Sequence, residues 1–283
     1  MNTTDISTIN KLIVNALKED IGSGDITSLA CIEVDAQSKA QLIVKESGII
    51  AGVEIAKMVL KHVDANLKID LLIEDGTLVK FGDIAFRVSG SARSILAAER
   101  LLLNIMQRMS GIATHTHRLL QLIAHTDCKL LDTRKTTPGF RILEKMAVKI
   151  GGGINHRFGL NDMVMIKDNH IDFAGGIVLA VNKVKNYLAE NQLNIPIEVE
   201  VRNIEDLQKL IPFEGILRVM FDNFTPDQIK QAIPLVPNKI ETEASGGINE
   251  DTLVAYAETG VKFISVGALT HQIKSLDLSL KAY

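Results

Sequence analysis

The chain has 283 residues, of which 46% are hydrophobic and 23% charged, with a net charge of −3 at pH 7. These proportions are typical of a globular protein that buries a sizeable core. The slightly acidic balance argues against nucleic-acid binding and against a membrane partner, and the two cysteines, Cys31 and Cys128, are too few for a disulfide framework or a zinc site.

The N-terminal hundred residues predict a mixed α+β domain. The polar start of the chain does not have the cationic and apolar regions of a signal peptide, and no apolar run nears the ~20 residues that span a bilayer, so a cytoplasmic protein is expected. Apolar residues at helical spacing predict an amphipathic helix over 6–20, and short β-rich runs between glycine-containing turns occupy 38–52 and 75–92. Residues 92–126 predict one or two long helices with a break near Gly111.

From Lys129 onward, short apolar runs alternate with helical stretches. Alternating β and α units predict a parallel sheet, either doubly wound or closed into a barrel. Three of the helices have clear start signals at Asn203, at Thr225 followed by Pro226, and at Asn249. The predicted strands are residues 129–132, 163–167, 195–201, 218–222, 239–245 and 262–267.

The strand ends favour a barrel. A barrel builds its site from the carboxyl ends of many strands, whereas a doubly wound sheet gathers it at one switch point. Neither GxGxxG nor GxxxxGK[ST] occurs. We therefore expect an α/β protein with an N-terminal α+β domain at 1–112, an incomplete α/β barrel at 113–269 with its site at the C-terminal strand ends, and a segment 270–283 that packs back on the first domain. The strand-end residues are Asp132, Lys167, Glu200, Asp222, Ser245 and Gly267.

Basic residues gather between Asp132 and His170, where seven Lys and Arg stand against four Asp and Glu, a charge of +3. A local positive field in an acidic protein predicts a site for a small anion. The alternative is a solvated surface on which each cation pairs with a nearby carboxylate. Arginine forks bind carboxylate or phosphate and lysine supplies a point charge, so the cluster suits a ligand with two or more negative charges. Its members are Arg134, Lys135, His156, Arg157 and Lys167.

Carboxylates form a second candidate group. Glu198 and Glu200 are two residues apart and therefore share one face of their strand, which we expect to be the barrel interior. Glu200 and Asp222 could hold Mg²⁺, accept hydrogen bonds from ribose hydroxyls or stabilise a developing cation. The alternative is structural ion pairing with Lys167 or Arg134.

Small residues directly follow two of the last strands, in EASGGIN at 243–249 and SVGALTH at 265–271. Glycines let the backbone approach a ligand, and N–H groups ahead of a helix form a phosphate cradle. Tight turns also use glycine, so the position of these loops after the last strands is what favours a phosphate site. His115 and His117 would not face each other on a helix and predict no metal site.

The run DTRKTTPGFRILEKMAVKIGGGINHRFGLNDMVMIKDNHI at 132–171, together with IEVEV, MFDNFTP, EASGGIN and ISVGALTH, resembles the quinolinate phosphoribosyltransferase family. The resemblance extends in order over almost the whole chain. It implies a Mg²⁺-dependent enzyme of NAD biosynthesis that transfers phosphoribosyl from phosphoribosyl pyrophosphate to quinolinate with decarboxylation. The products implied are nicotinate mononucleotide, pyrophosphate and CO₂.

The resemblance also implies roles for individual residues. The basic cluster would bind the quinolinate dicarboxylate, and Arg100 would reach into the neighbouring site of a homodimer. Glu200 and Asp222 would lie near the ribose and the metal, and would be catalytic together with Lys135. The 5′-phosphate would be held by Ser245, Gly246, Gly247 and Gly267.

Three other functions stay open from the sequence. The first is a related phosphoribosyltransferase with another anionic acceptor. The second is a Schiff-base aldolase that uses Lys135 or Lys167, whose neighbouring cations would lower the amine pKa. The third is a protein that binds an anion without catalysis, which would bind its ligand and release no pyrophosphate.

Overall fold

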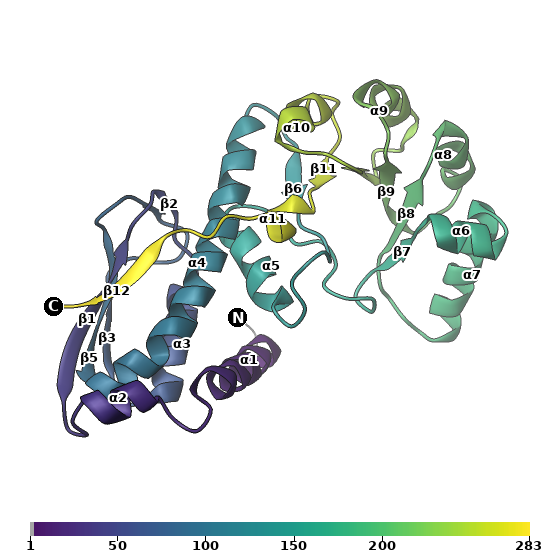
Figure 1. Cartoon of the computed structure of the whole chain (residues 1–283). Coiled ribbons are helices and arrows are strands. Elements are labelled where there is room, and N and C mark those ends of the chain that lie inside the picture. Colours follow the sequence, from purple (N-terminus) through teal and green to yellow (C-terminus); the bar gives the residue numbers. More distant parts are fainter. Residues whose placement is uncertain (1–2) are drawn as a thin grey trace. The chain divides into compact units, whose positions relative to one another are not determined.

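The computed structural model describes residues 3–283, which form two compact units (Figure 1). The first comprises the described residues up to His117, with Lys135–Gly152 and Leu269–Tyr283. The second comprises Arg118–Arg134 and Gly153–Ala268. The units therefore do not divide the chain into two contiguous ranges, because residues 135–152 belong to the first.

The first unit contains a four-stranded antiparallel sheet. The order β12-β1-β5-β3 brings the last strand of the chain beside the first, since β12 pairs with β1 from Ala40 opposite Ala282 to Val44 opposite Leu278. Figure 1 shows this last strand beside the first one. The strands are β1 (Gln37–Val44), β3 (Lys68–Leu71), β5 (Ile84–Ser91) and β12 (Leu278–Ala282), with a separate pair β2 (Gly48–Ile49) and β4 (Leu78–Val79).

Helices complete the first unit. The predicted amphipathic helix is confirmed as α1, which buries Ile9 and Ile13 and packs against α3 and α5. The α+β character expected of the N-terminal domain is also confirmed. The helices are α1 (Thr3–Ile21), α2 (Ile26–Cys31), α3 (Val53–Val63), α4 (Ala92–Leu122) and α5 (Arg141–Ile150), and the short α11 (Ala268–His271) begins at the last residue of the second unit and continues in the first.

Helix α4 runs unbroken through Gly111, so the single helix is confirmed and the predicted break is wrong. A Cβ at Gly111 would collide with the carbonyl oxygen of Lys274, which means that the glycine allows close approach of the C-terminal segment. The neighbouring Ser110 hydroxyl accepts the N–H of Ala51 at 2.9 Å and donates to its carbonyl at 3.2 Å. Both residues thus serve the packing of α4 against segments outside the helix.

The second unit is a parallel six-stranded sheet in the order β6-β11-β10-β9-β8-β7. Among the described residues β6 and β7 do not pair with each other, so the sheet stays open and the expectation of an incomplete α/β barrel is confirmed. The six predicted strands are all present, as β6 (Lys129–Leu131), β7 (Val164–Ile166), β8 (Ile197–Val201), β9 (Ile216–Asp222), β10 (Glu241–Ser245) and β11 (Phe263–Ser265).

The connecting helices begin where the capping residues predict. The side chain of Asn203 accepts the N–H of Asp206, that of Thr225 accepts the N–H of Gln228, and Asn249 caps a third helix. Figure 1 shows these helices along the outer side of the curved sheet. The helices of this unit are α6 (Asp168–Ala174), α7 (Ile177–Glu190), α8 (Ile204–Leu210), α9 (Pro226–Ala232), the 3₁₀ turn η1 (Ile233–Leu235) and α10 (Glu250–Ala257).

The two faces of this sheet differ in chemistry. Apolar residues such as Val199, Phe221 and Ile264 alternate with polar ones and are fully buried. The alternating polar residues share the other face, where the guanidinium of Arg218 contacts groups on β8, β10 and β11. Charged side chains of β8, β9 and β10 therefore lie together on this face of the sheet. No helix within residues 3–283 is long and apolar enough to cross a membrane.

Candidate active site

The second unit contains most of the residues predicted to form the site. Arg134 follows β6 and Lys167 follows β7. The other predicted residues of this unit lie in its loops or at the ends of its strands. Arg100 and Lys135 belong to the first unit, where both are exposed. The predicted residues that share the second unit are Arg134, His156, Arg157, Lys167, Glu200, Asp222, Ser245, Gly246, Gly247 and Gly267.

The basic window is divided between the two units. Lys135, Arg141, Lys145 and Lys149 lie with the first unit, where α5 buries Lys145. Within the second unit three cations remain, accompanied by three aspartates, so the local charge there is balanced. The three cations are Arg134, Arg157 and Lys167, and the three aspartates are Asp132, Asp162 and Asp168. The second unit therefore does not carry the net positive charge that the sequence predicts for this window. Any positive potential there depends on where the individual side chains lie.

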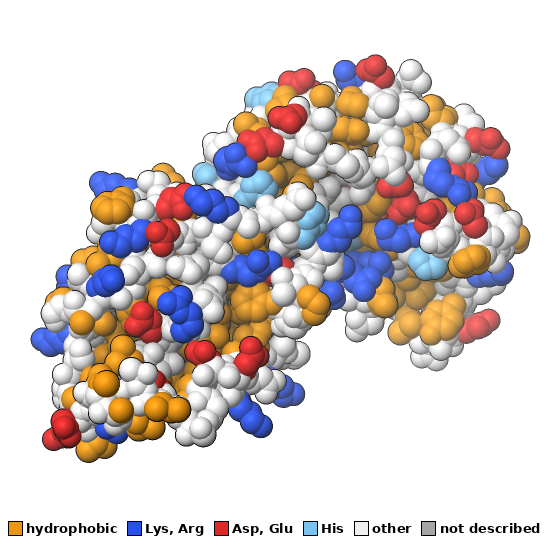
Figure 2. All heavy atoms as spheres, viewed as in Figure 1, with side chains coloured by type: hydrophobic (Ala, Val, Ile, Leu, Met, Phe, Trp, Pro, Cys, Tyr) orange, Lys and Arg blue, Asp and Glu red, His pale blue; other side chains and the backbone are white. Residues whose placement is uncertain are grey.

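Arg134 and Arg157 come from two loops near β6 and β7. Burial lowers the pKa of Arg157, and the positive charge of Arg134 lowers it further. The charges of the two guanidinium groups therefore repel each other. The Arg157 side chain is held by a hydrogen bond from Nη1 to the Met163 carbonyl at 3.2 Å, and Asp162 accepts the backbone N–H of Gly159 at 2.8 Å. Figure 2 shows Lys and Arg side chains over the β7 region, with acidic side chains toward β8 and β9.

Lys167 and Glu200 form an ion pair at the ends of adjacent strands, with Nζ 3.3 Å from Oε2. Burial raises the pKa of Glu200, Lys167 opposes this rise, and the charge of Asp222 adds to it. Lys167 keeps 46% of its side chain exposed while Glu200 is buried. The structural ion pair that the sequence offered as an alternative is therefore present, on the same residues predicted to bind substrate.

The loop after β10 requires glycine. Gly246 has φ +101°, and a Cβ there would collide with the Asn223 side chain. Gly247 also has positive φ, at +62°, with open space around its Cα. Asn249 accepts the N–H groups of Asp251 and Thr252 in the first turn of α10. The loop that contains Gly246 and Gly247 and the one that begins at Gly267 follow the adjacent strands β10 and β11.

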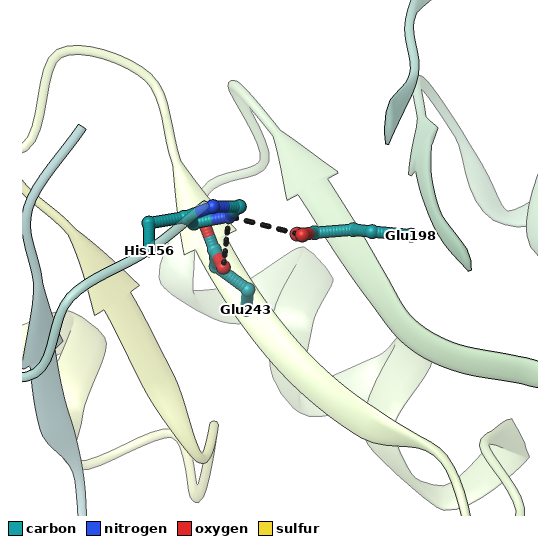
Figure 3. A group of neighbouring side chains, drawn as sticks. All are labelled: His156, Glu198 and Glu243. Atoms are coloured by element: carbon teal, nitrogen blue, oxygen red, sulfur yellow. Dashed lines mark ion pairs between the residues drawn. The ribbon is translucent and has the colours of Figure 1, made fainter. Parts of the chain in front are cut away.

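His156 lies inside the sheet and contacts two buried carboxylates (Figure 3). Its Nε2 is 2.9 Å from Oε2 of Glu198 and 3.4 Å from Oε2 of Glu243. Arg218 completes the cluster, with Nη1 3.0 Å from Glu243 and 3.9 Å from Glu198. Burial raises the pKa of Glu198 to about 7, and the charge of Glu243 adds to the rise. Burial lowers the pKa of His156, but its contacts with Glu198 and Glu243 raise it above its ordinary value.

Glu243 and Arg218 were not among the predicted site residues. Glu241, Glu243 and Ser245 alternate along β10 as Glu198 and Glu200 do along β8, and this alternation was the available signal. The partner of each carboxylate depends on strand order and register, which the sequence pattern alone leaves open.

In the first unit, Lys135 begins a segment that its neighbours hold in place. The Thr270 hydroxyl donates to the Lys135 carbonyl at 2.8 Å. Glu144 accepts the Thr137 N–H at 3.1 Å, and Arg108 donates to the Thr137 hydroxyl at 2.9 Å and to the Thr270 carbonyl at 3.0 Å. The backbone around Lys135 is therefore ordered while its side chain is exposed.

Models of two domains match this chain: the N-terminal domain of quinolinate phosphoribosyl transferase over residues 25–110 and its C-terminal domain over residues 112–281. The chain belongs to the quinolinate phosphoribosyl transferase family. Among its relatives is a chloroplastic "nicotinate-nucleotide pyrophosphorylase [carboxylating]" of Oryza sativa subsp. japonica, 46% identical over 96% of this chain and 77% of the relative. A "probable nicotinate-nucleotide pyrophosphorylase [carboxylating]" of Bacillus subtilis is 43% identical over 96% and 92%.

Solved structures agree with the family. The nicotinate-nucleotide pyrophosphorylase of Francisella tularensis superposes with a TM-score of 0.91 at 43% identity, covering 98% of this chain and 96% of that one. The resemblance first seen in the strand-end motifs therefore holds for the fold of the whole chain.

Proposed function

We propose that the protein transfers phosphoribosyl from phosphoribosyl pyrophosphate to quinolinate, with decarboxylation, in NAD biosynthesis. The products are nicotinate mononucleotide, pyrophosphate and CO₂. Membership of the family across both domains carries this proposal. The paired guanidinium groups, the strand-end carboxylates and the glycine loop of the second unit support it, because they match an anionic acceptor, a cationic transition state and a phosphate.

The acceptor is a dicarboxylate, and positively charged side chains bind it. Arg134 and Arg157 repel each other without ligand, so a carboxylate between them relieves the repulsion that lowers the pKa of Arg157. Lys167 has a flexible and half-exposed amine, which can exchange Glu200 for a substrate carboxylate. The two carboxylates of the quinolinate ring are thus bound by two kinds of group, a guanidinium pair and an ammonium.

The reaction develops positive charge on the ribose. As the bond from C1′ to pyrophosphate breaks, an oxocarbenium-like centre forms, and the ring nitrogen of quinolinate attacks C1′. Glu200 and Asp222 stand at the ends of β8 and β9 with the sign that stabilises such a centre. When Lys167 turns to the substrate, the negative charge of Glu200 is available to the ribose.

Mg²⁺ fits the residues at this edge, since the oxygens of Glu200 and Asp222 are the hard donors that it prefers. Mg²⁺ is commonly held by one or two carboxylates together with substrate phosphates. When bound, it would neutralise the pyrophosphate leaving group. The glycine loop at Ser245–Gly247, together with Gly267, binds the 5′-phosphate through backbone N–H groups.

Decarboxylation follows from the new bond. Once the ring nitrogen carries ribose, the ring is a pyridinium, and the electron pair of the bond to the adjacent carboxylate flows into it as CO₂ leaves. A proton then replaces CO₂ on that carbon. We assign Lys135 to the departing carboxylate, because its ammonium is exposed and the backbone that presents it is hydrogen bonded.

We further propose a homodimer in which Arg100 serves the neighbouring subunit's site. Arg100 is exposed on α4 of the first unit. Mixing inactive Arg100→Ala and Lys167→Ala proteins under subunit exchange tests this arrangement, because hybrid dimers then contain one intact site. Recovery of activity supports the proposal, and no recovery despite exchange contradicts it. A cytoplasmic location stays a prediction.

The function is tested by following pyridinium nucleotide formation with quinolinate and, in parallel, with nicotinate as acceptor. Product from quinolinate alone supports the proposal. Product only with another anionic acceptor identifies a related phosphoribosyltransferase. Quinolinate binding with no pyrophosphate release identifies a binding protein, and borohydride trapping of a keto substrate on a lysine identifies an aldolase.

A further inference from the structure

The interior of the second unit holds a cluster of ionisable groups that the proposed chemistry does not use. Glu198 and Glu243 are fully buried, and Arg218 is 7% exposed. Arg218 lies opposite Glu198 on β8 and opposite Glu241 on β10 in the sheet register. Burying a carboxylate costs several kcal/mol unless a partner compensates. The cost of burying two carboxylates beside one histidine therefore indicates that they have a function.

The cluster has the ligand atoms of a metal-ion site, but the positively charged guanidinium of Arg218 already lies within it. The ligand atoms of His156, Glu198 and Glu243 lie within 4.8 Å of one another. The guanidinium of Arg218 contacts both carboxylates, and its other nitrogens bind Glu241 at 2.8 and 3.2 Å. A divalent metal at the centre would be repelled by this fixed charge. The cluster therefore orients its histidine by charge and hydrogen bonding.

The contacts of His156 define the orientation of its ring. Nδ1 accepts the N–H of Arg157 at 2.6 Å, a contact that requires this nitrogen to be unprotonated and therefore favours the neutral ring, against the two carboxylates that raise the pKa of His156. Nε2 faces the two carboxylates and carries the proton that they attract. The backbone N–H of His156 donates to Asp132 at 2.8 Å. The ring is thus held by a hydrogen bond at Nδ1 and by the charges of the two carboxylates beside Nε2, and its backbone is held at a third point.

Arg157 is the residue that these contacts fix. Its backbone N–H donates to the His156 ring, and the charge of Arg134 lowers the pKa of its guanidinium. The charge of Glu198 attracts Arg157 and opposes that repulsion. The two buried carboxylates therefore hold the ring that binds the Arg157 backbone, and Glu198 also partly offsets the repulsion from Arg134.

We propose that Glu198 and Glu243 are positioning residues for the dicarboxylate acceptor, which clamp the His156 ring inside the sheet and so fix Arg157 beside Arg134. This inference rests on the proposed function and assigns His156 an indirect role in acceptor binding. Glu198 and Glu243 touch no substrate in this arrangement. Ribose and pyrophosphate are left to Glu200, Asp222 and the glycine loop.

The experiment uses Glu243→Gln, with Glu241→Gln as its matched control. Both residues stand on β10, both bind Arg218, and each substitution removes one negative charge, but Glu241 does not contact His156. Glu243→Gln is expected to raise the KM for quinolinate roughly 10- to 100-fold, as loss of a ligand's supporting partner does. The KM for phosphoribosyl pyrophosphate is expected to change less than about twofold. Glu241→Gln leaves both near their wild-type values.

A double-mutant cycle separates positioning from general damage. If Glu243 acts through His156, His156→Asn combined with Glu243→Gln weakens quinolinate binding no more than His156→Asn alone. Equal increases in both KM values, or full additivity in the cycle, would overturn the proposal. So would tighter quinolinate binding in Glu243→Gln, because the carboxylate would then act only as an opposing charge.

Imidazole nitrogen NMR of the full chain supplies a readout that needs no turnover. In the wild type, His156 is expected to carry its proton on Nε2 and none on Nδ1, and Glu243→Gln should shift these resonances while Glu241→Gln does not. A proton on Nδ1, or displacement of the signals by added Zn²⁺ at stoichiometric amounts, contradicts the clamp. If the wild type shows this ring state but never converts quinolinate, the proposed function fails while the buried clamp stands. If it converts quinolinate with unaffected KM in Glu243→Gln, the clamp's role fails alone.

Discussion

Arg108 binds the buried carboxylate of Glu144 through two nitrogen atoms, with Nε 2.7 Å and Nη2 2.6 Å from Oε1. The same Arg108 Nη2 reaches the Thr137 hydroxyl and the Thr270 carbonyl, while Glu144 Oε2 accepts the Thr137 N–H. A single ion pair thus ties α4 and α5 to the segment that presents Lys135. The pair lies within the first unit.

Arg108→Ala is expected to lower the free energy of unfolding by about 2–4 kcal/mol, because it leaves the fully buried Glu144 carboxylate without its cation. This range is set below that of a fully buried pair, since the Arg108 side chain is 30% exposed. Urea unfolding of both proteins measures the difference. Arg118→Ala is the control, because its pair with Glu250 is exposed on both sides and should be worth less than about 1 kcal/mol. Equal effects of the two substitutions would contradict this account.

Gly111→Ala is expected to destabilise the protein by about 1–3 kcal/mol, although alanine favours a helix. The added methyl group would collide with the backbone of Lys274 and displace the segment that leads to β12. Thermal unfolding, with hydrogen exchange of residues 278–282, reports both effects. Asn104→Ala, at an exposed position of the same helix, serves as the control and should not destabilise. A more stable Gly111→Ala protein would show that the close approach is absent.

The two cysteines should react at very different rates. Burial raises the pKa of Cys128 to about 12, so at pH 8 its thiol stays protonated and covered. Cys31 is exposed on α2. An aromatic disulfide reagent should therefore modify one thiol rapidly in the native protein and two after denaturation, and Cys31→Ser should abolish the fast phase. Rapid modification of two thiols in the native wild type would be inconsistent with the burial of Cys128.

Lys135→Ala is expected to lower kcat by a factor of about 10² or more, because the departing carboxylate loses the cation assigned to it. Steady-state kinetics with both substrates measure the change. Lys149→Ala removes a cation from the neighbouring helix α5 and should leave kcat within about twofold. Unchanged turnover in Lys135→Ala would remove this residue from the mechanism.

Periodicity was enough to predict the parallel strands, because each is a short apolar run bounded by turns and the capping residues mark the helices between them. Asn203, Thr225 and Asn249 begin their helices as expected. Gly111 shows the limit of this reasoning. Its effect depends on a partner 163 positions along the chain, Lys274, and local sequence carries no signal of that contact.

The residues of the candidate site also fall into those that the sequence pattern predicts and those that it does not. Lys167, Glu200 and Asp222 could be placed at strand ends because parallel strands end at one edge. His156 could be predicted as a functional residue, but its burial between Glu198 and Glu243 depends on strand order, which joins β8, β9 and β10 across the interior. The residues missed were those whose role comes from a partner on another strand.

The most direct measurement uses quinolinate with a labelled carboxyl carbon next to the ring nitrogen, together with phosphoribosyl pyrophosphate and Mg²⁺. The account predicts that labelled CO₂ and pyrophosphate appear in equal amounts as nicotinate mononucleotide forms, and that chelating the metal stops both. Pyrophosphate release without labelled CO₂, or no release of either by the folded protein, would contradict the proposed function.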